Sequence, residues 1–183
     1  CREKYPALLS YIGKYTLYGC SSLKHLYFPN VVSIEEHVFH TLGCENLILP
    51  NLKTMGAACF VNTTTLKRLI IPKCVSLTPN TCSSTGIYLL DAGNTSLIPS
   101  SSSMPNLTIL VLRNNVLTTL ENRSCIRSIE EIYVPQDLIE SYKVATNWAT
   151  YADKFKPLEG SKYEPLDWYK EEAWYKEEMK VWE

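Results

Sequence analysis

One four-residue pattern decides the fold, and it reads Leu26-Tyr27-Phe28-Pro29, Leu47-Ile48-Leu49-Pro50 and Leu69-Ile70-Ile71-Pro72 in three of its copies. Three more segments align with it, namely Tyr88-Leu89-Leu90-Asp91, Leu110-Val111-Leu112-Arg113 and Ile132-Tyr133-Val134-Pro135. The fourth positions are 29, 50, 72, 91, 113 and 135, so the steps are 21, 22, 19, 22 and 22 residues. This regularity indicates an internal repeat.

Each copy predicts a short β-strand, because apolar residues fill its first and third positions and side chains alternate between the two faces of a strand. Proline at the fourth position has no N–H for a ladder and therefore ends the strand. Strands that recur at a fixed period stack into a parallel ladder. The pairs predicted to point inward are Leu26/Phe28, Leu47/Leu49, Leu69/Ile71, Tyr88/Leu90, Leu110/Leu112 and Ile132/Val134.

A second pattern lies between the strands, where one apolar residue is followed five positions later by another apolar residue or by cysteine. We expect this turn-and-return segment to plug the other side of the coil. Its pairs are Ile12/Leu17, Ile34/Phe39, Met55/Phe60, Leu77/Cys82 and Leu120/Cys125.

The stretch from Ile12 to Leu23, followed by Leu26-Tyr27-Phe28-Pro29, resembles the leucine-rich repeat of the BspA-like (Treponema-type) family. The segment from Ile132 to Leu158 resembles the closing unit of such proteins in gut bacteria. The resemblance implies a leucine-rich repeat solenoid of mostly short parallel β-strands, with irregular or 3-10 return segments and a C-terminal capping helix. It also implies a secreted or surface-anchored protein used for adhesion and binding, without catalysis.

Three parts are expected along the chain. Residues 1–135 hold about six repeats and begin mid-repeat at Tyr5-Pro6, as if an upstream cap or further repeats had been removed. Residues 136–160 form the C-terminal cap, in which Asp137 can act as the helix N-cap. A helical stripe of apolar residues follows it at spacings of three to four, made of Leu138, Ile139, Tyr142, Ala145 and Trp148.

Residues 161–183 form an aromatic and acidic appendage with a net charge of about −3. Trp168-Tyr169-Lys170-Glu171-Glu172 recurs as Trp174-Tyr175-Lys176-Glu177-Glu178, a repeat of six residues. Three states remain open for this tail: docked on the repeats, exposed for a partner, or disordered in the isolated fragment. Its tryptophans, Trp168, Trp174 and Trp182, are a secondary candidate binding site.

The amino-acid composition argues against several classes of function. The 183 residues carry 18 Lys plus Arg and 19 Asp plus Glu, for a net charge of −1. This balance argues against nucleic-acid binding, which normally needs a basic face. An apolar fraction of 45% suffices for a core. No apolar run approaches the roughly 18–20 residues that span a membrane. Only 7 glycines are present, which makes a phosphate-binding loop improbable.

Cysteine and histidine offer a weak case for chemistry. Four of the seven cysteines occupy repeat slots that call for a small or apolar buried group, which predicts structural thiols. His37 and His40 lie near Cys44 in the sequence, and they could form a thiol–imidazole pair with it or bind a metal ion. Neither kind of site has a third residue to complete it. We therefore expect no enzyme, no cofactor and no metal site.

The most informative feature is the outward face of the strands. One outward stripe is apolar throughout, and Ile87 and Ile109 from the row two positions earlier form an apolar block in the middle with Leu89 and Val111. Three explanations stay open: cover by the chain itself, a partner or oligomer surface, and simple β-propensity. The stripe is Tyr27, Ile48, Ile70, Leu89, Val111 and Tyr133, and the earlier row is His25, Asn46, Arg68, Ile87, Ile109 and Glu131.

The leading hypothesis is a non-enzymatic, extracellular or cell-surface adhesion module that binds a partner along this stripe. The partner would be a host or bacterial surface protein or glycan, and the apolar face could also support self-association. The alternative is a structural spacer that projects another domain of a longer surface protein. A third hypothesis, an enzyme that uses Cys44 with His37 or His40, rests only on the pair described above.

Overall fold

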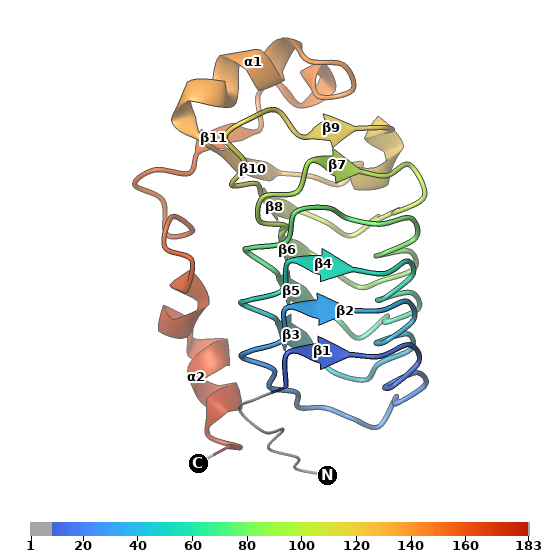
Figure 1. Ribbon diagram of the computed structural model, residues 1–183. Helices are drawn as coiled ribbons and strands as arrows, with labels where there is room; N and C mark the ends of the chain where they lie inside the picture. The colour runs from blue at the N-terminus through green and yellow to red at the C-terminus, as the bar shows by residue number, and fades with distance from the viewer. Residues whose placement is uncertain (1–8, 183) are drawn as a thin grey trace.

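The computed structural model describes residues 9–182, and its main feature is a parallel sheet of six short strands (Figure 1). The strands lie in the order β11-β10-β8-β6-β5-β3, so each repeat adds a strand beside the previous one. Their bounds are β3 Asn46–Ile48, β5 Arg68–Ile70, β6 Leu89–Asp91, β8 Ile109–Val111, β10 Glu131–Val134 and β11 Phe155–Pro157. One inward row is fully buried and paired in register: Leu47, Leu69, Leu90, Leu110 and Ile132. These parallel strands confirm a repeat fold.

The return side of the repeats contains a second set of strands that the sequence analysis treated as irregular. β1 (Tyr11–Ile12), β2 (Ser33–Ile34) and β4 (Thr54–Met55) form one parallel ladder. β7 (Leu97–Ile98) and β9 (Thr119–Leu120) form another. Every predicted plug residue is at most 8% exposed, which confirms that these pairs close the far side of the core.

Backbone hydrogen bonds link consecutive return segments. The N–H of Leu17 donates to the carbonyl of Val38 at 3.1 Å, and the N–H of Phe39 donates to that of Cys59 at 3.0 Å. Left-handed residues recur between these bonds, and such a conformation costs a non-glycine residue about 1–2 kcal/mol. Packing of the buried plug side chains therefore has to offset the conformational cost of these turns. The left-handed positions in four successive repeats are Tyr15, His37, Ala58 and Asn80, with φ of 59°, 58°, 56° and 58°.

The fourth repeat is shifted by two residues from the predicted alignment. Leu90, not Tyr88, pairs with Leu69 and points into the core. Asp91 consequently takes the outward place beside Ile70. The prediction was wrong here because side chains alternate with a period of two, so a shift by two residues preserves the alternation and the local pattern does not exclude it.

Two other expectations need correction. Ile87 was placed on the outer face, but it is 0% exposed and belongs to the inner core, as a consequence of the same shift. No strand is assigned to Leu26–Phe28, although Leu26 and Phe28 are buried as predicted. The strand end expected at Tyr5-Pro6 lies outside the described residues.

The C-terminal cap closes one end of the repeat stack (Figure 1). It contains η2 (Gln136–Leu138), α1 (Ile139–Val144) and η3 (Ala149–Tyr151), after η1 (Arg123–Ile126) in the last repeat. Asp137 lies within η2 and caps no helix, and α1 ends at Val144 because Ala145 is extended. Tyr142 and Trp148 are nonetheless buried, as predicted. The hydroxyl of Tyr142 accepts a hydrogen bond from the N–H of Thr118 at 2.9 Å. Trp148 Nε1 donates to the carbonyl of Thr118 at 2.7 Å.

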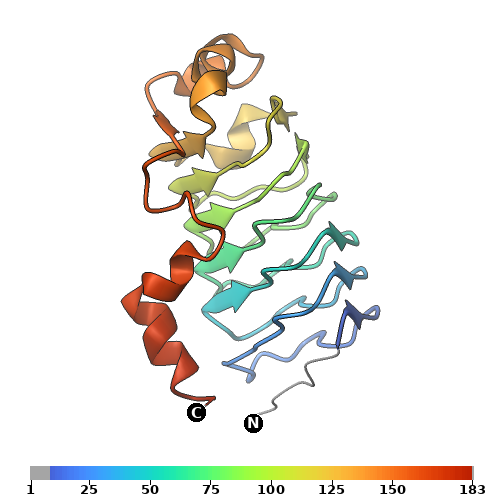
Figure 2. The ribbon, with the colours of Figure 1, turned by 60° about the vertical axis from the view of Figure 1, so that its left-hand side comes forward.

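The tail folds back along the outer face of the six-stranded sheet (Figure 2). It contains η4 (Trp168–Glu171) and α2 (Ala173–Met179). Of the three states left open for the tail, the structure shows the docked one. Among residues 9–182, no helix has the length and apolar character needed to cross a bilayer.

Candidate functional site

The centre of the outer face is an apolar cluster that the tail covers. Ile70, Leu89 and Val111 are 0%, 4% and 0% exposed and pack with Tyr163 and Trp168. The residues that join this cluster from the edges are only partly buried: Ile48, Tyr88, Ile109, Tyr133, Trp174 and Tyr175. Three members of the predicted partner stripe are therefore not an open surface in this structure, because the chain itself buries them.

A buried ion pair anchors the tail over this cluster. Asp91 is 0% exposed, and its Oδ2 lies 2.7 Å from Nη2 of Arg113, whose side chain is 6% exposed. Trp168 Nε1 donates to the same Asp91 oxygen at 3.0 Å. Arg113 also donates to the carbonyls of Tyr163 and Glu164, at 2.6 and 2.9 Å. Every charged group is thus hydrogen-bonded, as a buried pair requires.

Sequence reasoning missed this anchor, although a signal was present. Asp91 and Arg113 were both aligned at the fourth position, where the other four copies have proline. In the observed register Asp91 does not take that place, because it pairs with Ile70 and Val111 of the apolar stripe. The signal was a carboxylate within an otherwise apolar stripe, since a buried charge needs a partner, and the shifted alignment concealed it.

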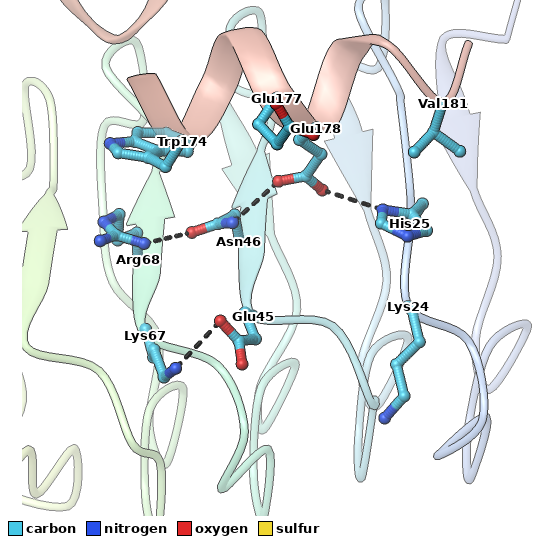
Figure 3. Close-up of a pocket in the computed structure, with 10 residues that line it drawn as sticks. All are labelled: Lys24, His25, Glu45, Asn46, Lys67, Arg68, Trp174, Glu177, Glu178 and Val181. Carbon is cyan, nitrogen blue, oxygen red and sulfur yellow. Dashed lines mark hydrogen bonds and ion pairs between the residues drawn. The ribbon is translucent and has the colours of Figure 1, made fainter. Parts of the chain in front are cut away.

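The second half of the tail lies over a more polar part of the face, and a groove remains beside it (Figure 3). The groove has a volume of about 640 Å³. Its wall on the sheet side includes a polar row, His25, Asn46 and Arg68, whose members lie two positions before Tyr27, Ile48 and Ile70 of the apolar stripe. Lys24, Glu45 and Lys67 flank that row, and α2 and the turn after it supply Trp174, Glu177, Glu178 and Val181.

A carboxylate of the tail is held by the polar row. Asn46 Nδ2 donates to Glu178 Oε2 at 2.8 Å, and Arg68 Nη1 donates to Asn46 Oδ1 at 2.9 Å. His25 Nδ1 lies 3.8 Å from Glu178 Oε1. Burial raises the pKa of the Glu178 carboxyl, while the hydrogen bond from Asn46 and the charges of His25 and Arg68 oppose that shift. The row therefore receives a carboxylate that has lost much of its water.

Aromatic rings hold Arg68 in position. Its guanidinium carbon lies 5.0 Å from the ring centroid of Tyr88 and 4.9 Å from that of Trp174. Such cation–π contacts add about 0.5–1 kcal/mol each at exposed sites. At the far end of the tail, the rings of Trp182 and Tyr27 lie 6.3 Å apart. Of the three candidate tryptophans, Trp168 is buried in the anchor, and Trp174 and Trp182 are half-buried.

The thiol–imidazole hypothesis has no support in the geometry. Cys44 is 1% exposed, and burial raises the pKa of its thiol to about 12. The thiolate, which is the nucleophilic form, is therefore scarce at neutral pH. His37 and His40 instead stack on Tyr15 and Tyr18, with centroids 5.1 and 4.5 Å apart. Across residues 9–182, no three His, Cys, Asp or Glu side chains gather as a metal site would require.

Four of the other described cysteines behave as core residues, whereas Cys20 is only partly buried at the edge of the core. Cys59, Cys74, Cys82 and Cys125 are at most 1% exposed, and burial raises the pKa of each thiol. No disulfide joins any of the six cysteines in the described part of the chain.

A comparison with protein families gives a match to the BspA type leucine rich repeat region, in six copies over residues 4–102. That match spans more than half of the 183 residues. The chain belongs to the BspA-type leucine-rich repeat family. No curated protein matches it. Repeats of this family are generally protein-interaction modules without enzymatic activity, and the proteins that carry them are typically surface-associated. The groove therefore lies on a repeat sheet of an interaction-type family.

Proposed function

We propose that this chain is a non-enzymatic, solenoid-type binding module of a secreted or cell-surface protein, and that it captures a partner protein along the outer face of its repeat sheet. The observation that carries the proposal is the groove beside α2, lined by the polar row His25, Asn46 and Arg68. Residues 1–135 would supply the recognition repeats, residues 136–160 the cap, and residues 161–183 the tail.

The groove suits a protein ligand better than a buried small molecule. It is open along the sheet and carries charges of both signs, with Lys67 paired to Glu45 at 2.9 Å. Such mixed polar surfaces give protein interfaces their specificity and orientation. Tyr27 and Ile48, the first two members of the predicted stripe, are half-buried and line a second pocket together with Tyr169 and Tyr175 of the tail. Ile70, Leu89 and Val111 could contact a partner only after the tail has moved.

The test is binding of the full chain to immobilised matrix proteins, mucins and glycans. Arg68→Glu should abolish a saturable hit, because it reverses the charge in the wall of the groove. Arg127→Glu is the matched control, since Arg127 is an exposed arginine outside the groove. Equal loss with both variants would indicate non-specific electrostatics. If the folded protein binds nothing on the array, the alternative function is favoured, namely a structural spacer that projects another domain.

A further inference from the structure

We infer that α2 holds the place of a partner segment: the part of the outer face beneath α2 binds an acidic, aromatic helical segment of a partner protein, which displaces α2. This inference rests on the proposed function and specifies its ligand. It depends on a difference between the two halves of the tail and on the chemistry of the surface below the second half.

The first half of the tail is firmly seated. Trp168 and Tyr169, from the first copy of the six-residue motif, are each 4% exposed. Trp168 also donates to the buried Asp91 at 3.0 Å. Removing this half would take the Trp168 hydrogen bond and the Tyr163 and Glu164 carbonyls away from the Asp91–Arg113 pair and expose it. We therefore expect the first half to stay docked during any exchange.

The second half is seated much less deeply. Trp174 and Tyr175, from the second copy of the motif, are half-buried, and α2 contains no fully buried residue. A helix of seven residues has little stability of its own in water, so its contacts with the sheet hold it. Glu172 joins the two halves in an extended conformation, with φ −74° and ψ 137°. α2 can thus leave while the first half remains in place.

The surface below α2 is suited to a carboxylate beside an aromatic ring. Asn46 donates to the Glu178 carboxylate, and Arg68 lies under the ring of Trp174. Trp174 and Glu178 are four residues apart and therefore lie on the same side of the helix. A partner helix that carries an aromatic residue and, four positions later, Glu or Asp would make the same two contacts.

Charge favours an acidic partner. Among the described residues, no carboxylate lies within ion-pair distance of Lys24 or Arg68, whereas Lys67 is paired with Glu45 and Lys180 with Glu177. The sheet side of the groove thus offers two cations that make no direct ion pair. Arginine held against aromatic rings presents its N–H groups in a fixed geometry, which suits a carboxylate.

The probe is a fluorescein-labelled peptide with the sequence of residues 172–182, measured by anisotropy against the full chain. The double variant Trp174→Ala, Glu178→Ala removes the ring and the hydrogen-bond acceptor of α2 without touching the sheet. We expect it to bind the peptide at least tenfold more tightly than the wild-type chain, because a tethered segment competes at millimolar effective concentration. Adding Arg68→Gln to the double variant should reduce that binding at least fivefold, whereas adding Arg127→Gln should leave it unchanged.

The control peptide carries alanine at the positions of both Trp174 and Glu178 and should not bind. Equal affinity for the wild-type chain and the double variant would overturn the inference, as would binding of the control peptide. Absence of peptide binding to a double variant that retains its circular dichroism spectrum would overturn it too. A partner found on the array and lost with Arg68→Glu, without any peptide binding, would leave the proposed function standing and refute this ligand.

Discussion

The two copies of the motif Trp-Tyr-Lys-Glu-Glu in the tail meet the same sheet in different ways. The first copy places Trp168 over a buried ion pair, where its indole N–H reaches Asp91. The second copy places Trp174 over Arg68 at the edge of an open groove. Equal sequence therefore gives unequal docking, because the outward residues of the sheet change from one repeat to the next. The tail is a fixed cover at one end and a shallowly seated helix at the other.

Removal of residues 161–183 is the most drastic way to break this comparison. We expect the shortened chain to self-associate, because Ile70, Leu89 and Val111 lose their cover and exposed apolar patches of this kind drive association. Sedimentation velocity at several concentrations measures the effect. Val111→Lys in the shortened chain is the control and should restore the monomer. A shortened chain that stays monomeric without this change would show that the stripe is not adhesive.

Arg113→Ala tests the anchor of the first half. It leaves Asp91 buried without its ion-pair partner, which costs about 3–5 kcal/mol of unfolding free energy. Urea denaturation measures this loss. Lys143→Ala is the matched control, because Lys143 pairs with Glu140 at 2.7 Å on the surface. The control should change stability by less than about 1 kcal/mol, and comparable losses in both variants would contradict the role of the buried pair.

Trp168→Ala and Trp174→Ala compare the two copies of the motif directly. We expect Trp168→Ala to cost about 3–5 kcal/mol, because it leaves a cavity in a buried cluster. Trp174→Ala should cost only about 1 kcal/mol, since a half-buried ring and a cation–π contact are lost. Urea titrations of both variants measure the difference. Losses of the same size would mean that the two halves of the tail are equally docked.

The smallest effect concerns pH at α2. Burial raises the pKa of Glu178 in the folded chain above its ordinary value of 4.5, so the folded state binds the proton more strongly than the unfolded one. The protonated form therefore favours docking, and docking should weaken as pH rises through the raised pKa. The expected change is below about 1 kcal/mol, because the side chain is partly exposed and solvent screens it.

Hydrogen exchange of the α2 amides, corrected for intrinsic rates at each pH, measures this effect. Glu178→Gln should remove the dependence and keep α2 protected at neutral pH. His25→Asn, which removes the facing imidazole, separates its contribution from that of Glu178. Protection that falls as pH is lowered would reverse the sign expected here.

The candidate site was only half visible in the sequence. Strand alternation placed His25, Asn46 and Arg68 on the outward face, but only the apolar stripe beside them was a predicted binding surface. The shallow groove could not be foreseen, because it exists only where α2 lies against that row. Cover by the chain itself was one of three open explanations for the apolar stripe. Hydropathy alone does not say whether the tail or another molecule packs against Ile70 and Val111.

The sequence by itself determined the period of the repeat, the inward rows and the plug residues, because these depend on alternation and spacing within about twenty residues. It misplaced the fourth strand by two residues, since two overlapping segments alternate equally well and only pairing with the neighbouring repeats chooses between them. The tertiary structure alone decided that Asp91 pairs with Arg113 and that Trp168, 77 residues away along the chain from Asp91, closes over both. Contacts over that distance depend on the three-dimensional stacking of the repeats, which no local pattern encodes.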